Sequence, residues 1–173
     1  MADMKQHKLG WIGIGRMGYA MAERLAKAGC DITVWNRTRE KAEPLAKSGA
    51  KIVGSLAELA ACDVVFTMVS AGKDVKEVLF GPSGVTSKGK APKIVVDSTS
   101  ISLEESAEIR DRLGKLGVKL LAAPVSGNAK VIKPASSRSW RRGRATPSTR
   151  CRPIFRRSGR APDRKSTRLN SSH

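Results

Sequence analysis

The sequence predicts an α/β protein with a doubly wound parallel sheet, on three observations. Short β-branched runs alternate with helical stretches from Lys8 onward, as in βαβ units with right-handed crossovers. The first apolar run leads directly into a Gly-x-Gly-x-x-Gly turn, and a helix with one apolar face follows it. No internal repeat is visible. The economical topology is therefore a Rossmann-type sheet with the strand order 3-2-1-4-5-6.

Six strands are expected from the apolar and β-branched runs. They cover residues 9–14, 31–35, 51–53, 64–69, 94–97 and 119–122. The first helix is expected over 17–28, with Gly29 as its stop. Capping boxes at Ser55-x-x-Glu58 and Ser102-x-x-Glu105 begin helices that run to residues 61 and 116. A further helix is expected over 39–47, where Pro44 would kink it unless the helix starts late.

The glycine turn predicts a dinucleotide site, because each glycine has a separate task. Gly13 permits the tight turn, Gly15 lets the backbone approach a pyrophosphate, and Gly18 lets helix and strand pack closely. Free N–H groups and the positive end of the helix dipole then favour phosphates. The alternative is a purely structural glycine turn. The expected cofactor contacts in this segment are Gly13, Ile14, Gly15, Arg16, Met17 and Gly18.

Two further loops should reach the same cofactor, since such a sheet binds its ligand where the strand order reverses. The loops after the first, fourth and fifth strands are residues 13–18, 69–73 and 97–100. We expect cofactor contacts from Val69 and Ser70 in the second of these loops, and from Thr99 and Ser100 in the third.

The residues after the second strand bear on which dinucleotide binds. A NAD-selective site carries an acidic side chain there, which accepts hydrogen bonds from the ribose hydroxyls. This chain has Asn36, Arg37 and Thr38 instead. Arg37 offers a permanently charged planar fork and Thr38 a hydroxyl, and both suit a 2′-phosphate. NADP is therefore favoured over NAD, with a simple solvated loop cap as the alternative role for Arg37.

Composition divides the 173 residues into two parts. Residues 1–133 carry 21 Lys and Arg against 14 Asp and Glu, a net of +7, whereas residues 134–173 carry 12 against 1, a net of +11. Cys30, Cys62 and Cys151 are too widely spaced for a disulfide framework or a zinc site. Residues 1–8 are polar and no apolar run reaches the length of a membrane span. We expect a soluble cytoplasmic protein without a metal site.

With these loops identified, residues 1–133 resemble the N-terminal domain of the β-hydroxyacid dehydrogenases, the family of 3-hydroxyisobutyrate and 6-phosphogluconate dehydrogenases. The matching segments are IGIGRMGYAMAERLAKAG, NRTREKAEPLAKSGA, DVVFTMVSAGKDVKEVLFG, VVDSTSIS and APVSGNAKVIK. The family's D-x-S-T-x-x-P stands here with Thr99 and Ser100 exchanged and Leu103 in place of proline. The last segment resembles the family's substrate loop A-P-V-S-G-G. By this resemblance Ser126, Gly127 and Asn128 would bind the substrate carboxylate, with Asn128 replacing a glycine.

The resemblance implies reversible hydride transfer between NADP and a small 3-hydroxy acid, with a lysine from the next domain as general acid and base. That lysine lies beyond the match, so no catalytic residue is assigned and the chain as written is expected to be inactive alone. A homodimer is implied only for the full-length parent. Imine reductases resemble the same N-terminal half, lack the lysine, and form the nearest alternative class of NADPH-dependent enzyme.

Residues 134–173 are rich in Arg, Ser and Pro and cannot form a core, so an unstructured tail is expected. Residues 163–173 match the translation of a DNA string that looks like a sequencing-library adapter. Restoring one base after Lys133 lets residues 134–151 read AGKLSVVASGPRDAFDAV, which resembles the family's continuation. We interpret 134–162 as a frameshift and 163–173 as adapter read-through. The alternatives are a basic arm that binds nucleic acid without sequence specificity, and an inert NADPH-binding fragment.

Overall fold

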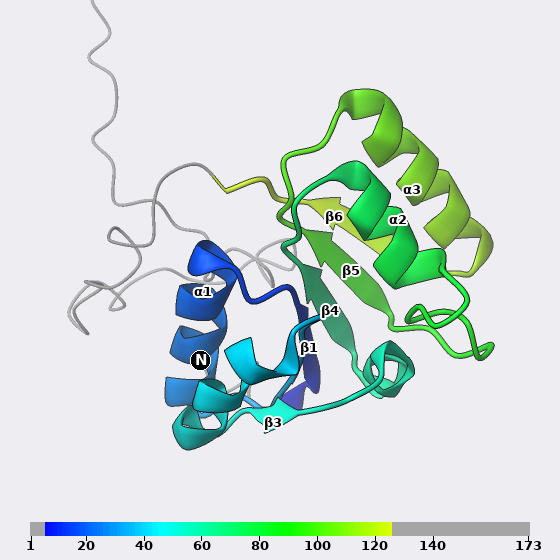
Figure 1. Ribbon diagram of the computed structural model, residues 1–173. Coiled ribbons are helices and arrows are strands. Elements are labelled where there is room, and N and C mark those ends of the chain that lie inside the picture. The colour runs from blue at the N-terminus through cyan, green and yellow to red at the C-terminus, as the bar shows by residue number, and fades with distance from the viewer. Residues whose placement is uncertain (1–5, 126–173) are drawn as a thin grey trace, which may run out of the picture. The chain divides into compact units, whose positions relative to one another are not determined.

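Six parallel strands form one sheet in the computed structural model, which describes residues 6–125 (Figure 1). The strand order is β3-β2-β1-β4-β5-β6, and every neighbouring pair is parallel. This confirms the predicted topology. The strands are β1 (Leu9–Ile12), β2 (Ile32–Trp35), β3 (Lys51–Ile52), β4 (Val64–Thr67), β5 (Ile94–Asp97) and β6 (Lys119–Ala122).

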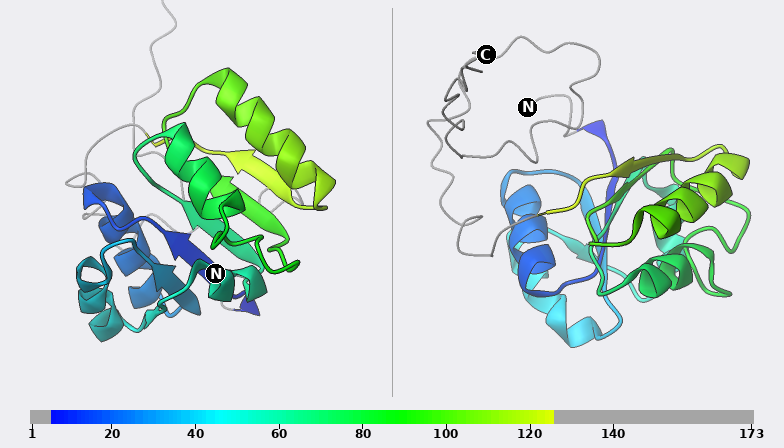
Figure 2. Two further views of the ribbon diagram at one scale, coloured as in Figure 1. Left: turned by 45° about the vertical axis from the view of Figure 1, so that its right-hand side comes forward. Right: turned by 90° about the horizontal axis from the view of Figure 1, so that it is seen from above.

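Helices cover both faces of this sheet. They are α1 (Arg16–Lys27), the 3₁₀-helices η2 (Arg39–Lys41), η3 (Glu43–Ser48) and η4 (Leu56–Ala61), then α2 (Gly72–Phe80) and α3 (Leu103–Lys115). Figure 2, seen from above, shows α1 on one face and α2 with α3 on the other. After β1 the chain adds β2 and β3 on one side of that strand, and it then crosses to add β4, β5 and β6 on the other side. The connecting helices therefore lie on opposite faces of the sheet. The loops after β1 and β4 therefore diverge and leave a crevice at their carboxyl ends.

The central strand β1 is buried on both faces, as expected for the middle of a parallel sheet. On one face Trp11 stacks on Phe66 with ring centroids 5.2 Å apart. On the other face Ile12 belongs to the apolar cluster that holds α2, α3 and η4 against the sheet. The indole Nε1 of Trp11 donates to the carbonyl oxygen of Gly13 at 3.0 Å. The core is thus tied directly to the glycine turn.

Several predicted element boundaries were wrong. β1 ends at Ile12 rather than residue 14, because Gly13 adopts φ +95° and turns the chain out of the strand. β4 ends at Thr67 rather than 69, β2 starts at Ile32 and β3 ends at Ile52, all within the usual fraying of element ends. α1 runs over Arg16–Lys27 and α3 over Leu103–Lys115, each within a residue of the expected limits.

The expected helix over 39–47 is two short 3₁₀-helices separated at Ala42. Pro44 lies in the first turn of η3, where no N–H is needed for an intrahelical bond. The break therefore falls before the proline rather than at a kink. Both predicted capping boxes are present, although the Ser55 box begins a 3₁₀-helix and only the Ser102 box begins an α-helix.

Cys62 lies in the core at the end of η4 and has only 7% of its surface exposed. Burial, with smaller contributions from Asp31 and Asp63, raises the pKa of its thiol from 9.0 to about 11. In the unfolded chain the thiol ionises near pH 9, whereas in the folded chain it stays protonated. The contribution of the protonated thiol to the unfolding free energy is therefore fully present below pH 9 and is lost as the pH rises toward 11. We expect about 2 kcal/mol less unfolding free energy at pH 10.5 than at pH 8 from this group.

Urea unfolding at the two pH values measures this loss, and Cys62→Ala serves as the reference because it lacks the titrating thiol. All other ionisable groups are the same in both proteins. The difference between the two proteins in how the unfolding free energy changes with pH is therefore the contribution of the Cys62 thiol. Equal slopes for Cys62→Ala and the original chain would contradict the assignment.

Candidate functional site

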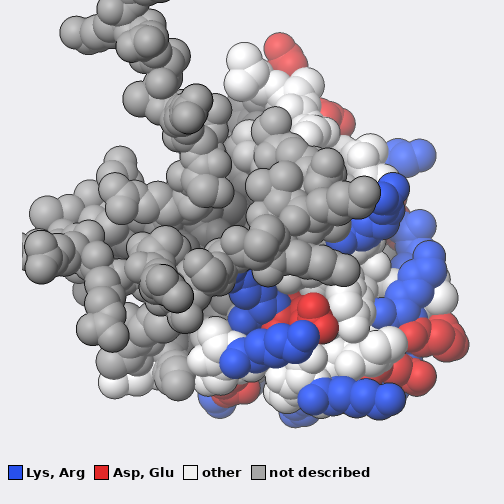
Figure 3. Space-filling model, turned by 90° about the vertical axis from the view of Figure 1, so that its left-hand side faces the viewer, with Lys and Arg blue, Asp and Glu red and all other residues white. Residues whose placement is uncertain are grey.

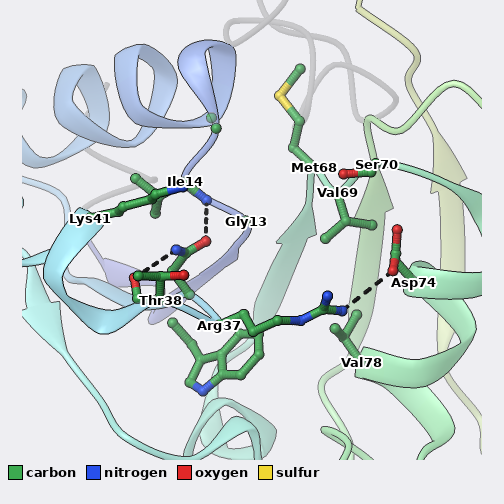
Figure 4. Close-up of a pocket in the computed structure, with 14 residues that line it drawn as sticks. Gly13, Ile14, Arg37, Thr38, Lys41, Met68, Val69, Ser70, Asp74 and Val78 are labelled. Carbon is green, nitrogen blue, oxygen red and sulfur yellow. Dashed lines mark hydrogen bonds and ion pairs between the residues drawn. The ribbon is translucent and has the colours of Figure 1, made fainter.

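A pocket of about 350 Å³ opens at the carboxyl ends of the central strands (Figure 4). Its walls come from the turn after β1, the loop after β2, the loop after β4, and α2. The lining residues are Gly13, Ile14, Gly15, Gly18, Trp35, Asn36, Arg37, Thr38, Lys41, Met68, Val69, Ser70, Asp74 and Val78. Segments distant in sequence thus meet at the reversal of strand order, which is where a doubly wound sheet binds its ligand.

The floor of the pocket is the glycine turn, and α1 begins immediately after Gly15. Gly15 is the N-cap residue of α1, with φ −74° and ψ −175°, and no side chain caps the first N–H groups of the helix. Among residues 6–125, no atom lies within 4 Å of a methyl group added at Gly15. The start of α1 therefore faces open space, where its dipole and N–H groups favour an anion.

The other two glycines of the turn are required by the fold itself. A methyl group at Gly13 would overlap the carbonyl oxygen of Met68, and one at Gly18 would overlap the carbonyl oxygen of Gly13. These close approaches hold β1, α1 and the end of β4 together. Gly15 has no such neighbour, so packing within the described residues does not explain its lack of a side chain.

Asn36 fixes the turn from the end of β2. Its Oδ1 accepts a hydrogen bond from the N–H of Ile14 at 2.8 Å, and its Nδ2 donates to the carbonyl oxygen of Thr38 at 2.8 Å (Figure 4). Both ends of the amide are therefore engaged by backbone. Asn36 positions the turn and its own loop, a role that the sequence did not separate from direct ligand contact.

Three charged side chains line the pocket: Arg37, Lys41 and Asp74. The guanidinium of Arg37 extends across the pocket toward α2 (Figure 4). Its Nη2 lies 3.4 Å from Oδ1 of Asp74 and 3.4 Å from Oε2 of Glu77. Sequence reasoning found Arg37 and Thr38 but missed Lys41 and Asp74. Lys41 follows Arg37 by four residues, a spacing that would have indicated it, whereas Asp74 is brought near only by the fold.

The loop after β5 supports the pocket from behind. The buried carboxylate of Asp97 accepts hydrogen bonds at Oδ1 from the Thr67 hydroxyl at 2.8 Å and from the N–H of Thr99 at 3.0 Å. The Thr99 hydroxyl in turn accepts from the N–H of Val69 at 3.2 Å. This chain of contacts joins the loops after β4 and β5, so Thr99 positions Val69 in the pocket wall.

The structure gathers nine of the predicted site residues around the pocket: Gly13, Ile14, Gly15, Gly18, Asn36, Arg37, Thr38, Val69 and Ser70. Arg16 and Met17 are the first residues of α1 and are not among the lining residues. Thr99 is buried behind the wall, and Ser100 is exposed outside the lining. The predicted substrate contacts Ser126, Gly127 and Asn128, and the whole of the tail, lie outside the described residues.

Residues 8–167 match the family model of the NAD binding domain of 6-phosphogluconate dehydrogenase. The chain belongs to this family. It is also similar to glyoxylate/succinic semialdehyde reductase 2 of Arabidopsis thaliana, with 39% identity over 123 residues that cover 70% of this chain and 34% of that protein. Human cytokine-like nuclear factor N-PAC is 37% identical over 122 residues, covering 70% of this chain and 22% of that protein. The chain thus spans about a third or less of each of these two relatives.

Solved structures agree with this placement. A 3-hydroxyisobutyrate dehydrogenase of Mycobacterium tuberculosis, determined with L-serine, matches with a TM-score of 0.64 and 28% identity over 72% of this chain and 42% of that one. An imine reductase of Myxococcus stipitatus in complex with NADP⁺ matches with a TM-score of 0.64 and 29% identity over 71% and 42%. The protein is therefore a member of an NAD(P)-binding oxidoreductase family that has both dehydrogenases and imine reductases as structural neighbours.

The surface carries both signs of charge. Figure 3 shows Lys and Arg side chains interspersed with acidic and uncharged ones on the part of this face that is not grey. In residues 6–125, every helix is too short or too polar to cross a bilayer.

Proposed function

We propose that residues 1–133 are the NADP-binding domain of an oxidoreductase that transfers a hydride between NADP and a small 3-hydroxy acid. The observation that carries the proposal is the open space at Gly15. Packing among the described residues does not require a glycine there, whereas a diphosphate lying against the backbone would. The uncapped start of α1 supplies N–H groups and a favourable dipole for that diphosphate.

Preference for NADP is supported by the end of β2. No carboxylate follows that strand, because Asn36 stands there and is engaged with backbone. Arg37, Thr38 and Lys41 line the pocket and offer two cationic groups and a hydroxyl to a 2′-phosphate. The cofactor would supply the hydride. The chain's own residues bind and orient it, with Val69 and Ser70 forming the wall after β4.

Substrate binding is assigned to Ser126, Gly127 and Asn128 through the resemblance to the family's substrate loop. Proton transfer would come from a lysine of a following domain, so the parent protein is the enzyme and this chain alone is expected to be inactive. An imine reductase is the second candidate, because the Myxococcus imine reductase matches with the same TM-score as the dehydrogenase. The dehydrogenase and the imine reductase are distinguished by whether the continuing coding sequence encodes that lysine.

Calorimetric titration of the full chain with NADPH and with NADH tests the cofactor assignment. We expect saturable binding of NADPH with a Kd below about 1 mM, a value in the range common for enzyme ligands. NADH should bind more weakly, because its ribose lacks the phosphate that Arg37 and Lys41 would contact. Absence of binding for both nucleotides at millimolar concentration would overturn the proposal, and tighter binding of NADH would remove the preference for NADP.

A further inference from the structure

Arg37 contacts two carboxylates of α2 within the chain, Asp74 and Glu77. Arg37 leaves the loop after β2 and reaches the first turns of α2, where its Nη2 lies 3.4 Å from Asp74 (Figure 4). The same Nη2 lies 3.4 Å from Glu77. The side chain of Asp74 is only 15% exposed, whereas that of Glu77 is 67% exposed. Asp74 also lines the pocket and Glu77 does not. The cation expected to bind a phosphate already faces a carboxylate inside the binding pocket.

We propose that Asp74 is a specificity-determining residue that competes with a 2′-phosphate for Arg37 and so narrows the preference for NADPH over NADH. The inference rests on the function proposed above. A 2′-phosphate carries close to two negative charges at neutral pH. It must either displace the Asp74 carboxylate from Arg37 or lie near it, and both lower its affinity. A ribose hydroxyl is uncharged, so NADH does not meet this repulsion.

The geometry suits a contact that a ligand can displace. The separation of 3.4 Å exceeds the 2.7–2.9 Å or so of a strong charge-assisted hydrogen bond. The Arg37 side chain is 69% exposed, and exposed pairs contribute little to stability. Arg37 can therefore turn toward a phosphate at little cost in folding free energy, while the negative charge of Asp74 remains beside the site.

Asp74 itself is held in place. It lies in the first turn of α2, where the helix dipole favours a carboxylate. Val75, Val78 and Leu79 are buried and hold the helix in the core, and Val78, one turn after Asp74, also lines the pocket. Lys76 also pairs with Glu108 of α3 at 2.8 Å. The backbone at Asp74 is therefore held by the packing of α2. Its carboxylate stays beside the pocket when a phosphate enters.

The test is calorimetric titration of the full chain and of Asp74→Asn with NADPH and NADH at low ionic strength. Removing one charge near a doubly charged phosphate should tighten NADPH binding by about five- to tenfold. NADH affinity should change less than about twofold, since its only negative charges are those of the diphosphate, which the proposal places at Gly15 and the start of α1 rather than beside Arg37. The ratio of the two affinities should therefore rise. Added salt should reduce the gain, because it screens the repulsion.

Two variants serve as controls. Glu77→Gln removes the exposed partner and should shift the ratio by less than Asp74→Asn does. Asp111→Asn removes the same charge from an exposed side chain on α3 and should leave the ratio unchanged. Asp74→Ser provides a second neutral replacement at the start of the helix in case the asparagine variant folds poorly.

The outcomes are separable. An unchanged or lower NADPH/NADH affinity ratio in the neutral Asp74 variants, with binding retained, overturns the inference and leaves the cofactor assignment standing. Failure of the original chain to bind either nucleotide overturns the proposed function instead. A ratio that rises equally in Asp111→Asn would show a general charge effect and would also overturn the role of Asp74.

Discussion

Gly15→Ala is expected to remove most dinucleotide binding while leaving the fold intact. The methyl group would lie more than 4 Å from every atom beyond its chain neighbours in the part of the chain that the structure describes, and φ of −74° is allowed for alanine. In the proposed complex, the diphosphate would approach the backbone through that space. Loss of one hydrogen bond to a charged group costs about 1.5–3 kcal/mol. NADPH affinity should therefore fall by about 10- to 100-fold, measured by calorimetry.

Thermal unfolding provides the other half of this experiment. Alanine is a poorer N-cap than glycine, so stability should fall by no more than about 1 kcal/mol. Gly114→Ala is the matched control, because Gly114 is a second glycine with open space around it but lies in α3, far along the chain from the pocket residues. It should leave NADPH binding unchanged. Equal affinity of Gly15→Ala and the original chain would place the phosphates elsewhere.

The glycine turn was predictable because its signal is local. Gly13, Gly15 and Gly18 lie within six residues, between a strand and a helix that their own apolar patterns reveal. The separate tasks assigned to Gly13 and Gly18 are confirmed by the atoms that a methyl group would overlap. Strand order followed from the same alternation of elements, since handedness rules leave few topologies for such a chain.

Other features of the site depend on contacts that no local pattern records. Asp74 meets Arg37 across 37 positions of sequence, and the N-cap residue of α2, Ala71, makes no side-chain cap hydrogen bond that would mark the start of the helix at Gly72. The sequence alone therefore predicted Arg37 and the Thr38 hydroxyl for a 2′-phosphate, with no carboxylate near them. The break of residues 39–47 into two 3₁₀-helices also depends on tertiary packing, because it places Leu45 in the core and Pro44 at a position without a required N–H.

Gly13→Ala is expected to destabilise the fold severely. Gly13 has φ +95°, a conformation that L-residues with a side chain adopt only with strain of about 1–3 kcal/mol. The added methyl group would also overlap the backbone carbonyl of Met68, which cannot rotate away as a side chain would. Relief requires the ends of β1 and β4 to separate, and overpacking of this kind costs about 1–3 kcal/mol. Together these effects should lower the unfolding free energy by roughly 3–5 kcal/mol.

Gly49→Ala separates the two causes, because Gly49 has the same φ of +95° but no atom within 4 Å of an added methyl group. It should show the backbone strain alone, about 1–3 kcal/mol in urea unfolding. The excess loss in Gly13→Ala then measures the overlap with Met68. Since typical domains have only about 5–15 kcal/mol of stability, Gly13→Ala should be partly unfolded at moderate temperature and Gly49→Ala should not. Equal losses in the two variants would mean that the approach of Gly13 to Met68 does not hold β1 and β4 together.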